Sequence, residues 1–189
     1  MKRAMQGAKS AKSRQHERSV IAGCLIAGMF GAGCQIDSRY EVVPSSVCAS
    51  REVWTWTDKD SPLMNPGRSC IGCHTETNDP VHAPIFTVAG TVMLAADEAD
   101  DCRGAPAMTV ILTDADGTEW PMPANSAGNF WIAPDSLVAM PYTVRVVDRA
   151  GNERVKQNPV SDGDCASCHT QDTANGAPGR ILPPDVTSP

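Results

Sequence analysis

The sequence predicts a mainly β protein built around a small antiparallel β-sandwich. Between residues 85 and 158, apolar and polar side chains alternate in short runs, as they do in strands with one buried face. Clusters of Asp, Asn, Ser and Gly separate the runs, and such clusters are typical of tight turns between antiparallel strands. Short strands at this spacing favour a sandwich.

Six runs are expected to form the strands. They are FTVAGTVML at 86–94, MTVILT at 108–113, TEWPM at 118–122, NFWI at 129–132, YTVRVV at 142–147 and a weaker ERVK at 153–156. The stretch Asp114-Ala-Asp116-Gly, after the second run, lacks the full EF-hand loop, so we expect a hairpin turn there rather than a calcium site. In a simple up-and-down order, six strands would return the chain to the end of the sandwich where it started, so we expect the segments before and after the sandwich to lie close together at the same end.

The first 33 residues have the pattern of an export signal. Six basic side chains and one acid precede an apolar run at 20–33, which is too short to span a bilayer comfortably but suits the apolar core of a signal peptide. The run ends in GAGCQ, which resembles the lipobox of bacterial lipoproteins. That resemblance implies acylation of Cys34 as the new N-terminus. With Gln35 next to it, it also implies an outer-membrane lipoprotein on the periplasmic or cell-surface face.

Two CxxCH motifs flank the predicted sandwich. They consist of Cys70, Cys73 and His74, and of Cys165, Cys168 and His169. On one helical turn, the cysteines and the histidine of such a motif project from the same face. The turn then supplies two thiols for thioether bonds to a haem and one imidazole for its iron. Each motif therefore predicts a short helical segment that holds one covalent haem c, with its histidine as the proximal iron ligand.

Other uses of paired cysteines fit these motifs less well. A thioredoxin-like redox pair needs a βαβ context, which the sequence does not predict. A four-cysteine zinc site usually has a short spacer between its pairs, whereas 91 residues separate the two pairs here. Coincidence is the third alternative, but two of the three histidines of the mature chain directly follow the two CxxC pairs.

Few residues qualify as the sixth ligand of either iron. His82 is the only other histidine of the mature chain, and Met64 is the methionine closest to a motif. The alternative for Met64 is ordinary packing. Because at most one haem can gain a second histidine from within the chain, a five-coordinate haem stays open as an alternative.

Cys48 and Cys102 are expected to form a disulfide. Every other cysteine of the mature chain already has a chemical use, and a bond between these two leaves no odd thiol in an oxidising compartment. Two unpaired buried cysteines are the alternative.

The mature chain is strongly acidic. From residue 35 onward, ten Lys and Arg face 21 Asp and Glu, which gives a net charge of −11. This charge argues against nucleic acid as a partner and suits a redox partner protein with a basic docking patch. The chain's contact with the membrane is expected through the lipid anchor alone.

The central block resembles the carboxypeptidase-regulatory-like, or transthyretin-like, β-sandwiches of secreted bacterial proteins. The segments that carry this resemblance are AGTV at 89–92, TVILTDADG at 109–117, NSAGNF at 125–130 and PYTVRVVDRAGN at 141–152. The flanks, with MNPGR before CIGCH and GAPGRI after CASCHT, resemble multihaem c-type cytochromes of environmental bacteria. Together the resemblances imply a dihaem cytochrome lipoprotein with a sandwich between its two CxxCH motifs.

The expected organisation of the chain has five parts. They are a lipoprotein signal peptide at 1–33, a lipid-linked tether with Trp54 and Trp56 at 34–65, a first haem segment at 66–84, the sandwich at 85–158, and a second haem segment with a C-terminal tail at 159–189. The two tryptophans either cover a haem face or close the sandwich edge. The tail from Leu182 onward, with three prolines, is expected to be disordered or extended.

The function expected from this pattern is one-electron transfer at the cell envelope through two haems, with no catalytic residue. The alternative is a haem enzyme or small-ligand sensor in which one haem is five-coordinate. A third alternative is a β-sandwich binding module in which the haems are secondary.

Lipidation gives a first test. Cys34→Ser removes the thiol that would be acylated, so it should release the protein into the soluble periplasmic fraction or leave the signal uncut. Fractionation and the size of the processed chain check this. Unchanged processing with unchanged membrane association would contradict the lipobox assignment.

Overall fold

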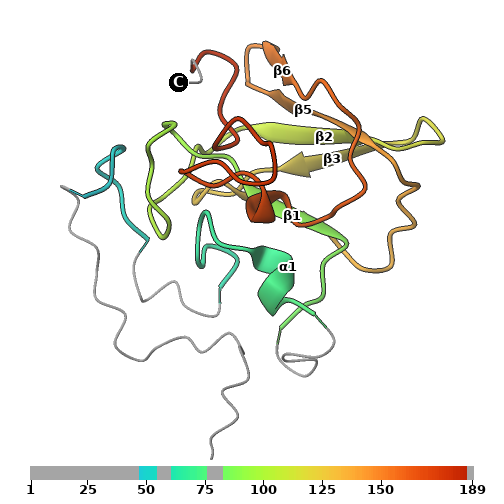
Figure 1. Cartoon of the computed structure of the whole chain (residues 1–189), viewed down its shortest axis with the longest axis horizontal. Coiled ribbons are helices and arrows are strands. Elements are labelled where there is room, and N and C mark those ends of the chain that lie inside the picture. Colours follow the sequence, from blue (N-terminus) through green and yellow to red (C-terminus); the bar gives the residue numbers. More distant parts are fainter. Residues whose placement is uncertain (1–46, 55–60, 76–82, 187–189) are drawn as a thin grey trace, which may run out of the picture. The chain divides into compact units, whose positions relative to one another are not determined.

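The computed structural model describes residues 47–54, 61–75 and 83–186, all of which belong to one compact unit, and their regular structure is mainly β (Figure 1). The elements in chain order are α1 (Cys70–Cys73), β1 (Val88–Thr91), β2 (Thr109–Thr113), β3 (Glu119–Pro123), β4 (Asn129–Ile132), β5 (Thr143–Val147), β6 (Glu153–Val155) and the 3₁₀ turn η2 (Cys165–Ser167). Each of the six predicted runs overlaps one of these strands, so the mainly β, antiparallel class is confirmed.

Two antiparallel sheets share one hydrophobic core. β1 pairs with β4 in the smaller sheet, and the larger sheet has the order β3-β2-β5-β6. Alternation along β2 buries Val110 and Leu112, as expected for a strand with one face in the core. Val88 and Phe130 from the smaller sheet pack in the same buried cluster. The core therefore forms between the two sheets.

The strand order differs from a simple up-and-down arrangement. β1 pairs with β4 rather than with β2. The acidic connection that follows β1 makes its own β contacts, since Met93 forms an antiparallel bridge with Gly104 and the Ala105 N–H donates to the Val92 carbonyl at 2.7 Å. Periodicity does not predict this contact, because a single isolated bridge among acidic and turn residues leaves no alternating run.

Three turns between strands share the same side-chain hydrogen-bond pattern. The side-chain oxygens of Asp114, Asn125 and Asp148 each accept the backbone N–H groups two and four residues ahead, at 2.8–3.1 Å. In each turn a glycine three residues ahead has φ between +81° and +85°. One oxygen of the Asp114 carboxylate accepts the two backbone N–H groups, and the Trp120 side chain donates to the other oxygen at 2.9 Å. The hairpin-turn interpretation of this stretch is thus confirmed.

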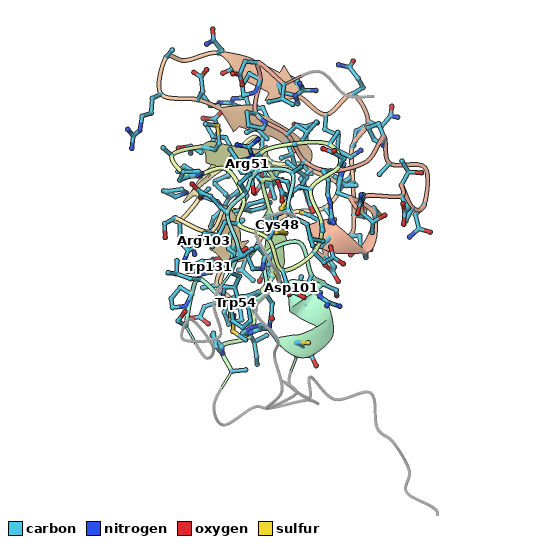
Figure 2. The ribbon with its side chains drawn as sticks, turned by 90° about the vertical axis from the view of Figure 1, so that its left-hand side faces the viewer. Cys48, Arg51, Trp54, Asp101, Arg103 and Trp131 are labelled. Carbon is cyan, nitrogen blue, oxygen red and sulfur yellow. A yellow bond between two sulfur atoms is a disulfide. The ribbon has the colours of Figure 1, made fainter. Side chains whose placement is uncertain are left out.

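Residues 47–54 are packed onto the β unit. Cys48 is bonded to Cys102 with 5.9 Å between their Cα atoms, which confirms the predicted disulfide. Val53 forms an antiparallel bridge with Cys102, and the fully buried Trp54 donates its backbone N–H to the Asp101 carbonyl at 3.0 Å (Figure 2). Trp54 is therefore packed inside the unit beside this bridge. Trp56 lies outside the described residues.

The C-terminal segment is packed as far as residue 186 and turns at 184–185, so the expectation of a disordered or extended tail is wrong for these residues. Leu182 is 1% exposed, and Arg154 on β6 donates to the Pro183 and Val186 carbonyls. The three prolines of the tail lack an N–H donor, which suggested a segment without hydrogen bonds to the rest of the protein. Their carbonyls can still accept hydrogen bonds.

Removal of the disulfide gives a test of the fold. The bond joins residues 54 positions apart, so its loss in Cys48→Ser/Cys102→Ser should cost up to about 4 kcal/mol of unfolding free energy in the chain-entropy description. Urea unfolding of the two proteins measures this. An unchanged midpoint would show that the bond does not constrain the unfolded chain.

Candidate cofactor site

Both CxxCH motifs lie against β1 (Figure 1). One edge of β1 pairs with β4, and segments on either side of the second motif bond to its other edge. The Ala89 N–H donates to the Gly163 carbonyl at 2.9 Å, and the Met93 N–H donates to the Ile181 carbonyl at 2.8 Å. The second motif is therefore held between one attachment to β1 and one to Met93, two residues after the end of that strand.

The first motif forms one α-helical turn. Ser69 caps it by accepting the Gly72 N–H at 3.1 Å, and the His74 N–H donates to the Cys70 carbonyl at 2.8 Å. This bond places the first cysteine and the histidine on one face of the turn.

The second motif forms a shorter turn of 3₁₀ type. Its His169 N–H donates to the Cys165 carbonyl at 2.9 Å, which repeats the bond of the first motif. The sequence predicted a short helical segment at each motif, whereas the structure has an α turn of four residues at the first and only a 3₁₀ turn of three residues at the second. Asp164 occupies the cap position here but makes no side-chain capping bond, which removes one source of support for a full α turn.

The two motif histidines are anchored in the same way. His74 Nδ1 lies 2.6 Å from the Pro84 carbonyl, and His169 Nδ1 lies 2.7 Å from the Gly179 carbonyl. In both motifs the carbonyl belongs to the residue ten positions ahead. A carbonyl can only accept, so each Nδ1 carries the hydrogen, and the neutral ring then presents a lone pair at Nε2. Metal-binding histidines in proteins are held by this kind of bond.

Burial favours the neutral form of the second histidine. Desolvation lowers the pKa of His169 from its ordinary value, and it outweighs the opposing effect of the bond to Gly179. The imidazole is therefore in the form that can coordinate a metal at neutral pH.

Three of the four motif sulfurs are free thiols. These are Cys70, Cys165 and Cys168, whereas Cys73 is disulfide-bonded in this structure. Burial raises the pKa of Cys70 and of Cys165 to about 12. Thioether bonds at the first motif require that Cys73 be reduced first.

Arg180 connects the backbones of the two motifs. Its side chain is 2% exposed and pairs with Asp100 at 2.6 Å. Its remaining N–H groups donate to the carbonyls of Glu98 at 3.1 Å, Gly67 at 3.4 Å and His169 at 3.5 Å. Gly67 lies just before the first motif, so a single buried guanidinium contacts the main chain of both.

A polar network fixes the loop before the first motif. The buried Thr91 hydroxyl accepts the Gly67 N–H at 2.9 Å and donates to Asn129 Oδ1 at 2.8 Å. The Asn129 amide then donates to the Met64 carbonyl at 2.8 Å. Two adjacent strands, β1 and β4, thus hold the loop, and Met64 is tied to them through its backbone.

Aromatic rings extend from the first motif histidine toward the surface. The His74 ring stacks on Phe86 with 4.5 Å between centroids, and Phe86 lies 5.7 Å from Trp131. Trp131, on β4, is 37% exposed (Figure 2). This stacking restricts rotation of the His74 ring, in addition to the bond from its Nδ1.

The remaining candidates from the sequence have different outcomes. His82 and Cys34 lie outside the described residues. Cys48, Cys102 and the buried Glu98 carboxylate offer ligand atoms within 4.8 Å of one another, but the two sulfurs are bonded to each other and are unable to serve as thiolate ligands.

Comparisons with known proteins add no family assignment. No protein-family model matches the chain, and no curated protein matches it. Within the described ranges, no helix is both long enough and apolar enough to cross a bilayer.

Sequence reasoning missed the anchors of the two histidines and the role of Arg180. The anchors are backbone carbonyls, which no residue type encodes. Arg180 is buried among three backbone carbonyls and pairs with Asp100, an arrangement that depends on how the chain folds back and that its residue type does not indicate.

Substitution of Arg180 tests its connecting role. Arg180→Gln leaves buried carbonyls without donors and Asp100 without its cation, so it should lower the free energy of unfolding by about 2–4 kcal/mol. The matched control is Arg145→Gln, because Arg145 pairs with two carboxylates that stay solvated, Glu119 (54% exposed) and Glu153 (46% exposed), so its loss should cost below about 1 kcal/mol. Equal losses in urea unfolding would contradict this ranking.

Proposed function

We propose that the protein is a c-type cytochrome that holds two covalent haems and carries single electrons at the cell envelope. The observation that carries this proposal is the repeated histidine geometry. Both CxxCH histidines donate from Nδ1 to a backbone carbonyl ten residues ahead, and both leave Nε2 for a metal. One such histidine is common in proteins, but the same anchor behind two CxxC pairs favours a haem at each.

The donor set suits haem better than the other cofactors of cysteine pairs. Cys70, Cys73 and His74 would hold one haem, and Cys165, Cys168 and His169 would hold the other. A haem supplies reversible one-electron chemistry at its iron. The protein's own part is to orient the two imidazoles, through the carbonyls of Pro84 and Gly179, and to hold the two turns at a fixed separation.

The position of the two turns supports a single two-haem unit rather than two separate carriers. Both contact β1, and Ser69 at the start of the first motif donates to Asp164 at the start of the second. Gly90 allows the second turn to lie close to β1, since a Cβ at this position would lie 2.8 Å from the Cys165 Cβ. Electrons could then pass directly between the haems.

The partner and location follow from charge and from the N-terminal pattern. The mature chain carries a net charge of −11, which suits a redox partner with a basic docking patch. The lipobox-like GAGCQ suits a lipid anchor at Cys34 and an outer-membrane location. These parts of the proposal rest on the sequence alone.

A haem enzyme or small-ligand sensor is the second candidate. The observation that favours it is the shortage of histidines, since His82 is the only one left for a sixth position. Carbon monoxide separates the two functions. A reduced spectrum that carbon monoxide leaves unchanged supports electron transfer, whereas a shifted spectrum supports an open iron site.

The haem count tests the proposal directly. The protein from a host that matures c-type cytochromes should contain two covalent haems per chain, measured from the absorbance of the haem and the concentration of the chain. Cys70→Ser/Cys73→Ser and Cys165→Ser/Cys168→Ser should each retain one haem, because each removes a single attachment turn. The control Cys48→Ser/Cys102→Ser should retain both. A chain without covalent haem, or with zinc bound to free thiols, would refute the proposal.

A further inference from the structure

Asp164 and Ser69, the two residues that directly precede the motifs, are linked by a hydrogen bond. Asp164 directly precedes Cys165, and it forms a parallel bridge with Ala89 on β1. Its Oδ2 atom accepts a hydrogen bond from the Ser69 hydroxyl, and Ser69 directly precedes Cys70. The same carboxylate therefore stands next to the first cysteine of each motif.

No Lys, Arg or His among the described residues forms an ion pair with Asp164. In the part of the chain that the structure describes, the ion pairs near the motifs are Arg68 with Asp101 and Arg180 with Asp100, and Asp164 takes part in none. Its Oδ1 atom is buried and has no hydrogen-bond partner. A partly buried carboxylate of this kind acts over a longer range than a solvated one, because little solvent screens it.

Both attachment cysteines respond to this charge. Burial is the first cause of the raised pKa of Cys70, and the charge of Asp164 is the second. At Cys165, burial again acts first, followed by the charges of Cys70 and then of Asp164. The field of a single carboxylate thus reaches the two positions at which the haems would be attached.

We propose that Asp164 is a shared positioning residue that stabilises the oxidised form of both haems and so lowers both reduction potentials. This inference rests on the proposed function. Each iron gains one electron from the redox partner on going from the ferric to the ferrous state, and no bond or proton changes place. The ferric site carries one more positive charge, so a nearby carboxylate favours it. Because Asp164 adjoins both turns, it acts on both haems in the same direction.

Asp164→Asn is the central variant, because an amide oxygen can still accept from Ser69 while the charge is lost. Spectroelectrochemical titration of the mature two-haem protein at fixed pH should show that both midpoint potentials rise. Ser69→Ala keeps the charge and removes the hydrogen bond, so it should shift the midpoints less. Asp116→Asn, in the exposed turn between β2 and β3, removes one charge elsewhere and should leave both midpoints unchanged.

The outcomes separate this inference from the proposed function. If the Asp164→Asn protein holds two haems but only one midpoint potential rises, or neither does, the inference is overturned. The cytochrome proposal would then still stand. An equal rise in Asp116→Asn would overturn it as well, since any lost charge would then suffice. A wild-type chain without haem would overturn both. If Asp164→Asn fails to mature, Asp164→Ser, an uncharged capping residue, carries the same expectation of two raised midpoints.

Discussion

The hydrogen bonds at the outer edge of β1 are the constraint on which the rest of the site depends. Ala89 and Met93 bond to Gly163 and Ile181, and these two residues lie on either side of the second motif. An unpaired strand edge carries N–H and C=O groups that require partners, and the C-terminal segment supplies them. The pairing that completes the sheet thereby brings the second motif to the strand that already supports the first.

Buried polar groups then fix the two turns with respect to each other. Thr91 and Asn129 hold the loop before the first motif, and Arg180 bonds to Gly67 and His169. Such networks are costly when a partner is lost, because each buried group keeps its desolvation penalty. The arrangement therefore has few alternatives of similar energy. That property suits a pair of redox centres whose separation must stay constant.

The sequence predicted the β class and the strands well, because the alternation in runs such as TVILT and TVRVV reflects one buried face. It also predicted the Cys48–Cys102 disulfide, because every other cysteine of the mature chain has another expected use. The sequence also predicted that the segments carrying the two motifs lie close together, but the strand order used for that prediction is wrong. An up-and-down order of six strands was assumed, whereas β1 pairs with β4 and the motifs meet through the β1 edge. Edge pairing by isolated bridges leaves no periodic signal, and backbone acceptors such as the Pro84 and Gly179 carbonyls leave no residue-type signal.

The central claim is that one strand holds two redox centres as neighbours, and the iron–iron distance tests it most directly. Spin coupling between the two oxidised irons, or a crystal structure of the mature protein, measures that distance. The contacts of both turns with β1 predict a separation below about 20 Å, the length of a six-residue strand. Two uncoupled irons farther apart than that would contradict the account.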